Sequence, residues 1–142
     1  MGKCVLVFQN CLYFTASSLA RAVNRLAEET FGALGFSPSH AFILMYVNEH
    51  PGAPQKELAE QMNLAPSTVT RFVDWLVNKG LVERQTEGKI TRVFATADGL
   101  QLQPELQAAW QRLFQRYAAV LGEEQSRSLT RMIGSAALDL EK

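Results

Sequence analysis

Apolar residues recur every three or four positions through the first third of the chain, which is the spacing of an amphipathic helix. The first such stretch runs from Cys11 to Leu34 and contains Leu12, Ala16, Leu19, Val23, Leu26 and Ala27. Gly35 interrupts it, and Ser37-Pro38 then supplies an N-cap residue followed by a proline at the first helical position. We therefore expect a second helix from Pro38 to the break at Pro51-Gly52.

Two shorter helices follow, separated by a tight turn. Pro54 opens the first, which ends near Asn63, a residue type that tolerates the left-handed backbone conformation. The second runs from Pro66 to Lys79 and stops before Gly80. Two short helices joined by such a turn are typical of a helix-turn-helix, whose second helix is exposed for docking.

Beyond Gly80 the pattern changes to the alternation that is typical of β-strands. Residues 81–85 and 90–95 are predicted strands, and Thr86-Glu87-Gly88-Lys89 between them is a predicted tight turn. A lone hairpin is barely stable, so this one has to pack against the neighbouring helices. A helix-turn-helix followed by a hairpin predicts a winged helix.

The last third returns to the helical spacing. Thr96 is a candidate N-cap for a long helix that runs through Leu121 to Gly122, and a final helix has an apolar stripe from Leu129 to Leu140. The winged helix does not cover the apolar faces of these two helices or of the first predicted helix. The simplest way to bury these faces is against the same helices of a second copy. We therefore predict one domain over residues 1–142, mainly α with a small β-hairpin wing. Dimerisation helices at 1–35 and 100–142 flank a winged helix-turn-helix lobe at 37–99.

Composition and charge narrow the classes of function. The 142 residues are 47% apolar and 20% charged, which suits one globular domain. The 14 Lys and Arg balance the 14 Asp and Glu, so binding to nucleic acid has to depend on a local patch. We expect the acids of the terminal helices to balance an acid-poor contact surface.

The N-terminal segment and the absence of reaction motifs exclude further classes. Residues 1–8 are too short for a membrane span and lack a signal-peptide pattern, so a cytoplasmic protein with no membrane partner is expected. No nucleophile-base pairing, glycine-rich phosphate loop or metal-ligand spacing is found, which argues against an enzyme, a cofactor or a metal. His40 and His50, ten residues apart, do not change this.

The helix from Pro66 to Lys79 has two distinct faces at about 100° per residue. One is apolar, with Val69, Phe72, Val73 and Leu76, and the other is polar, with Ser67, Arg71, Asp74 and Asn78, flanked by Thr68 and Thr70. An ordinary surface helix is also polar on one side. Within this helix, however, no acid precedes Asp74, so nothing there repels phosphate. The free N–H groups of a helix N-terminus also favour phosphate. Ser, Thr and Arg are suited to phosphates and base edges, so the pattern favours DNA.

The stretch "QKELAEQMNLAPSTVTRFVDWLVNKGLVER", followed by the wing and Thr96-Ala97-Asp98-Gly99, resembles the MarR family of bacterial and archaeal transcription regulators. The resemblance extends over nearly the whole chain. It implies a homodimer, most often a repressor, that binds a near-palindromic double-stranded operator and leaves it when a small molecule or an oxidant acts. The two recognition helices would lie about one DNA turn apart, roughly 34 Å.

The resemblance also implies which residues contact DNA. The major groove would receive the helix start at Pro66 together with Ser67, Thr68, Thr70 and Arg71, while Gln55 and Lys56 would lie near the backbone. The wing tip lacks the family's Asp-x-Arg, so Lys89 is the expected replacement, with Arg84 or Arg92 behind it. Lysine lacks the flat fork of arginine, so weaker minor-groove discrimination is expected. Ala65 stands where the family usually has a capping Asp or Ser.

Two routes of regulation stay open. Cys11 in "NCLYFTASSLAR" resembles the reactive cysteine of the hydroperoxide-responsive branch, and the alternative is a small buried core residue. Cys4 would lie about 10 Å from it along one helix, too far for a disulfide within that helix. In the family the effector cleft lies between the dimerisation helices and the DNA-binding lobe. The aromatic residues at these spacings are more often part of a core than of a ligand site. The candidates for the cleft are Tyr13, Phe14, Ser17, His40, Tyr46 and Trp110.

An alternative function belongs to another class. Zero net charge and the altered wing tip also suit a winged helix that binds proteins and does not recognise DNA. A protected palindrome in a footprint would separate these two hypotheses.

Overall fold

The computed structural model describes residues 7–141, so the expectation for Cys4 lies outside the described residues. After a short 3₁₀ turn at Val7–Asn10 come seven helices and three strands within this range. The helices are α1 (Leu12–Gly32), α2 (Pro38–Glu49), α3 (Gln55–Met62), α4 (Pro66–Asn78), α5 (Ala97–Gln101), α6 (Gln103–Leu121) and α7 (Glu123–Leu140). The strands are β1 (Ala53–Pro54), β2 (Val82–Glu87) and β3 (Ile90–Ala95). The predicted class, mainly α with a small wing, is confirmed.

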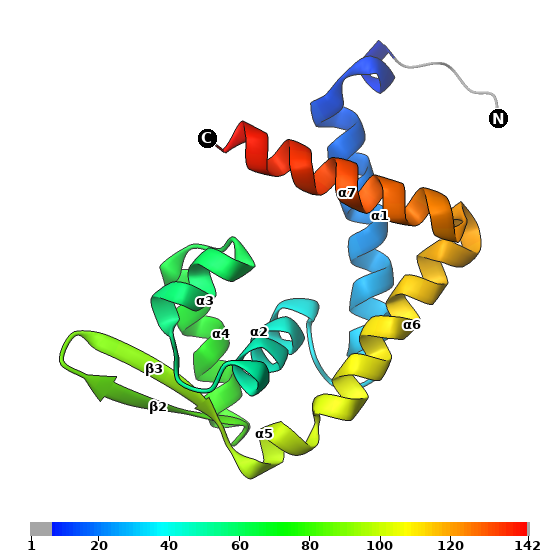
Figure 1. Ribbon diagram of the computed structural model, residues 1–142. Coiled ribbons are helices and arrows are strands. Elements are labelled where there is room, and N and C mark those ends of the chain that lie inside the picture. Colours follow the sequence, from blue (N-terminus) through cyan, green and yellow to red (C-terminus); the bar gives the residue numbers. More distant parts are fainter. Residues whose placement is uncertain (1–6, 142) are drawn as a thin grey trace.

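Figure 1 shows two parts. The lobe, residues 37–99, holds α2, α3, α4 and the sheet, and the hairpin of β2 and β3 projects from it. The stem consists of α1 and α6, which lie side by side, and of α7, which crosses α1. In Figure 1 the N-terminal end of the described chain lies at the end of α1 farthest from the lobe, and α7 carries the C-terminal end past α1 to the side above α3.

The sheet has one strand more than the sequence predicted, and its hairpin turn is shorter. β1 pairs antiparallel with β3, with Ala53 opposite Val93, and this two-residue strand is too short to show an alternating pattern. In the hairpin, Glu87 pairs with Ile90, which leaves Gly88-Lys89 as a two-residue turn. Gly88 has a φ of 59°, as such turns require. The predicted four-residue turn is therefore wrong.

The long helix predicted from Thr96 to Leu121 is also wrong, because it breaks at Leu102. Thr96 does cap α5, accepting a hydrogen bond from the Gly99 N–H at 3.2 Å. Pro104 then lacks the N–H that would continue the helical ladder, and α6 starts afresh at Gln103. Gly99 lies against the base of the wing, where an added Cβ would be 2.2 Å from the Leu81 carbonyl oxygen.

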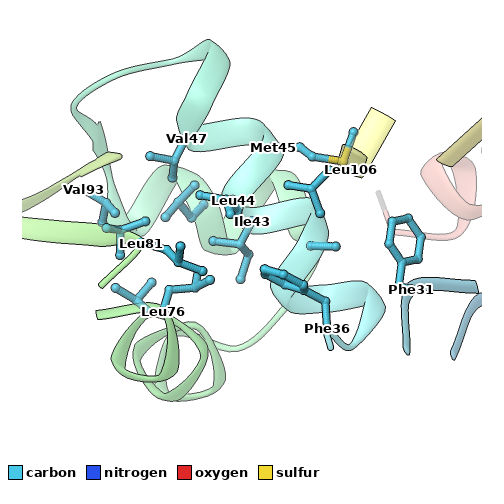
Figure 2. Close-up of a cluster of buried hydrophobic side chains, with 14 of the residues drawn as sticks. Phe31, Phe36, Ile43, Leu44, Met45, Val47, Leu76, Leu81, Val93 and Leu106 are labelled. Carbon is cyan, nitrogen blue, oxygen red and sulfur yellow. The ribbon is translucent and has the colours of Figure 1, made fainter. Parts of the chain in front are cut away.

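The core surrounds α2. This helix is buried on several sides, and Ala41, Ile43, Leu44 and Val47 are fully buried. Figure 2 shows Ile43 and Leu44 near Leu76 and Leu81, with residues from the sheet and the stem completing the cluster. These contributions are Val93 from β3, Phe31 from α1 and Leu106 from α6.

Candidate nucleic-acid interface

Helix α4 has the two faces that its sequence predicts. Val69, Val73 and Leu76 are buried, whereas the side bearing Ser67 and Arg71 is exposed. The N-cap position belongs to Ala65, whose methyl side chain has no atom that could accept a hydrogen bond. The first N–H groups of α4 are therefore left for a ligand or for solvent.

On the polar face, Thr70 is more constrained than Ser67 or Arg71. Its hydroxyl donates to the Pro66 carbonyl oxygen at 3.1 Å and accepts from Gln55 Nε2 at 3.3 Å. Arg71 makes a long contact of 3.5 Å from Nη2 to Thr68 Oγ1. Arg71 and Thr68 are therefore adjacent on the surface, next to the start of α4.

Arg84 lies at the base of the wing, and its guanidinium points to α3 and α4. Its Nε donates to Gln55 Oε1 at 2.6 Å, and its Nη2 donates to the Thr70 carbonyl oxygen at 3.1 Å. Its Nη1 forms an ion pair with Asp74 Oδ1 at 2.7 Å. All three nitrogens are engaged inside the lobe, and the side chain is 28% exposed.

The wing presents one cation at its tip. Arg92 is turned back, with Nε at 3.0 Å from Glu87 Oε1 and Nη1 donating to the Gly52 carbonyl oxygen at 3.0 Å. Lys89 is exposed in the turn, and no ion pair joins it to any residue within 7–141.

Lys89 also shares a groove with the start of α3. The groove, of about 580 Å³, lies between α3 and β3 and is open to solvent. Its lining includes the cations Lys56 and Lys89 and the acids Glu57 and Glu60. The structure thus brings Lys89, predicted for the minor groove, next to Gln55 and Lys56, which were predicted near the DNA backbone.

The charged residues of the lobe nearly cancel. Residues 37–99 contain six cations, Lys56, Arg71, Lys79, Arg84, Lys89 and Arg92. They contain seven acids, Glu49, Glu57, Glu60, Asp74, Glu83, Glu87 and Asp98. The lobe as a whole therefore has no excess of positive charge, and an acid-poor contact surface can only be local. Attraction to DNA has to come from the few cations that remain unpaired.

The residues predicted for an effector cleft fall into separate clusters within one chain. His40 stacks on Trp75 at 4.1 Å between ring centroids, and its Nδ1 is 2.7 Å from Ser37 Oγ. Burial lowers the pKa of His40. Tyr46 instead stacks on His50 at 4.1 Å and donates to Glu57 Oε2. The hydrogen bond to this carboxylate, together with burial and its charge, raises the pKa of Tyr46.

The other predicted cleft residues lie along the stem. On α1, Tyr13 is exposed and Ser17 is half-buried. Phe14, also on α1, packs on Phe8 with 5.8 Å between the ring centroids. The ring of Trp110 on α6 lies edge-on to that of Phe42, with 6.1 Å between the centroids, and Trp110 borders a groove of about 410 Å³. A cleft that uses all six residues would therefore need an arrangement that one chain does not provide.

Cys11 is exposed at the N-cap of α1. The alternative of a buried core residue is wrong for the single chain. Within residues 7–141, no three His, Cys, Asp or Glu side chains gather closely enough to hold a metal ion. The helices in the same range are too short or too polar to cross a membrane.

Comparison with known proteins identifies the family. Residues 36–87 match the model of the MarR family. The HTH-type transcriptional repressor MdtR of Bacillus subtilis (strain 168) is 31% identical over 120 residues, which cover 80% of this chain and 77% of that protein. The chain belongs to the MarR family. MarR proteins are DNA-binding transcription regulators and not enzymes.

Solved structures of MarR proteins have the same fold. The MarR protein from Peptoclostridium difficile DA00132 has a TM-score of 0.82 at 17% identity, covering 99% of this chain and 95% of its own. CouR from Rhodococcus jostii RHA1, bound to p-coumaroyl-CoA, has a TM-score of 0.80 at 22% identity, covering 94% and 96%. The winged helix and the flanking stem helices are thus the architecture of the family.

Proposed function

We propose that this MarR-family chain is a homodimeric repressor of a palindromic operator and that a small molecule or thiol oxidation releases it from DNA. The observation that carries the proposal is the start of α4. Exposed Ser67 and Arg71 lie beside uncapped helix N–H groups, on a helix anchored to the core by Val69, Val73 and Leu76. MdtR, which is named a repressor, supports the direction of regulation.

Three groups of residues have distinct roles in this proposal. Ser67, Thr68 and Arg71 read base edges in the major groove, where arginine forms a bidentate pair with guanine. Pro66 and the N–H groups after it approach a phosphate. Lys56 and Lys89 border one groove on the protein surface, and both contact phosphates of the DNA backbone. Thr70 offers little hydrogen-bonding capacity, because its hydroxyl is already engaged.

The dimer is supported by the exposed apolar side chains of the stem. A groove of about 580 Å³ between α1 and α7 is lined by Leu12, Leu19, Val23, Met132 and Ile133, among others. Of the residues in α7, Ser126 is the one that is buried in the single chain. A second copy has the same apolar stripe and can bury this surface symmetrically.

Two inputs are proposed for release. CouR has a similar fold and is bound to p-coumaroyl-CoA, which favours a small organic effector. The family resemblance would place this effector between the stem and the lobe. The exposed Cys11 favours a peroxide instead. A Cys11→Ser variant separates them: loss of peroxide-induced release assigns the input to the thiol, and persistent release assigns it elsewhere.

The test of DNA recognition uses duplexes that the wild-type protein selects from a random library. Arg71→Ala should lower affinity for the selected duplex by about 10-fold or more per half-site, because a bidentate base contact is lost. Asn78→Ala, at the far end of the same face, is the control and should leave affinity unchanged. An unaltered footprint for Arg71→Ala would contradict the assignment. Binding by the wild type should also weaken steeply with salt.

The second candidate function is a protein-binding winged helix. The excess of acids over cations in the lobe favours it. In that case the selection yields no preferred duplex, and footprinting of genomic DNA shows no protected palindrome.

A further inference from the structure

Four side chains from three elements meet beside the recognition helix, and we call them the Arg84 clasp. Gln55 is the first residue of α3, Thr70 and Asp74 lie on the polar face of α4, and Arg84 comes from β2. The nitrogens of the Arg84 guanidinium bind two helices: Nε donates to α3, whereas Nη1 and Nη2 contact α4. The clasp thus joins both helices of the helix-turn-helix to the base of the wing.

The clasp occupies groups that would otherwise be available to DNA. Gln55 needs both its amide oxygen and its amide nitrogen to read adenine. Here Oε1 accepts from Arg84 at 2.6 Å, and Nε2 donates to Thr70 Oγ1 at 3.3 Å. The Thr70 hydroxyl in turn gives its hydrogen to Pro66 O. Gln55 and Thr70 are therefore held in fixed orientations beside Ser67 and Arg71.

A direct phosphate contact by Arg84 is the competing explanation. Such a contact needs an uncompensated positive charge directed at solvent, but Nη1 lies 2.7 Å from Asp74 Oδ1. The planar guanidinium fork is the group suited to hold several partners at fixed angles, which an ammonium cannot do. The lobe as a whole has no excess of positive charge either. Correct orientation of α4 and the wing therefore has to contribute much of the discrimination.

We propose that Arg84 is a positioning residue for operator recognition, which fixes α3, α4 and the wing relative to one another and does not itself contact DNA. The inference rests on the proposed function, in which α4 reads the operator. It reassigns Arg84 from a DNA contact to a residue that acts through Gln55, Thr70 and Asp74. Specificity should then depend on the shape of the guanidinium, and its charge alone should not suffice.

The first test compares Arg84→Lys with Arg84→Gln, using the duplex selected by the wild type and an unrelated duplex of equal length. Both variants should lose about 10-fold or more in affinity for the selected duplex, since hydrogen bonds of a charged group are lost. Arg84→Lys keeps the charge, so its affinity for the unrelated duplex should not change, and neither variant should alter the salt dependence. A phosphate contact predicts otherwise: Arg84→Lys would retain binding, and Arg84→Gln would weaken both duplexes and lower the salt slope by about one.

The second test uses Asp74→Asn, for which the two explanations predict opposite signs. Removing an acid from the DNA-facing side raises affinity for any duplex if only charge matters. If the clasp positions α4, the variant gains affinity for the unrelated duplex but loses affinity for the selected one. Glu83→Gln is the matched control, an exposed acid beside Arg84 on β2 that lies outside the clasp. It should change both affinities in the same direction.

The outcomes separate this inference from the proposed function. If the wild type prefers no duplex, the proposed function fails. If the wild type does select a duplex but Arg84→Lys retains full preference for it, the positioning role is overturned. Thermal unfolding and molar mass are measured for every variant, and if Arg84→Lys does not fold, Asp74→Asn decides by the sign of its effect.

Discussion

In the lobe, apolar side chains from α2, α4 and the sheet bury one another within a single chain, whereas in the stem most of the corresponding side chains face outward. Leu76 in α4 is 0% exposed, while Met132 in α7 is 68% exposed. The stem helices bury apolar residues mainly at the ends of α1 and α6 nearest the lobe, around Phe31 and Leu106. Both regions have an arginine that joins elements, since Arg84 joins three elements of the lobe and Arg116 on α6 bonds Glu29 and Thr30 on α1.

This difference is what the proposed dimer requires, with the core around α2 buried within one chain and the apolar face of the stem left for a second copy. An apolar surface as continuous as that of α1 and α7 is rarely left exposed by a soluble monomer. The two regions should therefore respond differently to the same kind of substitution. Changes in the lobe alter the stability of each chain, and changes in the stem alter association.

The largest effect is expected where a charge is introduced into the exposed stem. Met132→Glu should weaken the dimer by more than about 100-fold, because an unpaired charge buried in an interface costs several kcal/mol. The molar mass in solution, measured by light scattering or sedimentation, should fall to that of one chain. Leu100→Glu is the control, since Leu100 is 51% exposed in α5, outside the apolar groove of the stem. If Met132→Glu stays dimeric, α7 is not the interface.

A matched pair of truncations sharpens the comparison. Leu76→Ala should lower the free energy of unfolding by about 3 kcal/mol at any protein concentration, because it creates a cavity in the core. Leu138→Ala removes the same atoms from a side chain that is 70% exposed in one chain. Its effect should appear as a dependence of the unfolding midpoint on protein concentration. Equal, concentration-independent losses for both would contradict the division into lobe and stem.

A smaller loss is expected at the boundary between the wing and the stem. Gly99→Ala brings a Cβ within 2.2 Å of the Leu81 carbonyl oxygen, so the backbone has to shift, at a cost of about 1–3 kcal/mol. Thermal unfolding measures this loss. Gly32→Ala is the control, because an added Cβ there has no neighbour within 4 Å in the described chain. A Gly99→Ala protein as stable as the control would show that this close approach relaxes freely.

The smallest effect concerns pH and is confined to the lobe. Burial holds the pKa of folded His40 below its ordinary value of 6.5, so the unfolded chain takes up a proton first as pH falls. Stability is therefore full above 6.5 and declines below it. The urea midpoint of the wild type, followed from about pH 7.5 to about pH 5.5, should fall more than that of His40→Gln.

The sequence predicts most helices because their partners or their end signals are local. Ser37-Pro38 starts α2, and Asn63, in the left-handed conformation, ends α3. What the sequence does not predict depends on long-range contacts or on single residues. β1 is too short for a pattern, and the break at Leu102 follows from one proline. Arg84 could be named from its position near the wing, but its partners lie up to 29 residues away in the chain, and no spacing rule connects them.

The chain crosses between lobe and stem twice, through the loop before Ser37 and at Leu102 (Figure 1). If the lobe turns against the stem, the line that joins these two crossings is the natural axis, and the shared core around Phe31 and Leu106 limits the angle. At the second crossing Asn48 Nδ2 donates to Gly99 O and to Gln103 Oε1, at 3.2 and 2.7 Å. Among the described residues, Asn48 Oδ1 and Gln103 Nε2 remain buried without a partner. Opening this crossing breaks the two hydrogen bonds of Asn48 Nδ2, but it also lets Asn48 Oδ1 and Gln103 Nε2 pair with water, which offsets part of the cost. The wing projects far from this line, so a small swing of the lobe becomes a large displacement at Lys89.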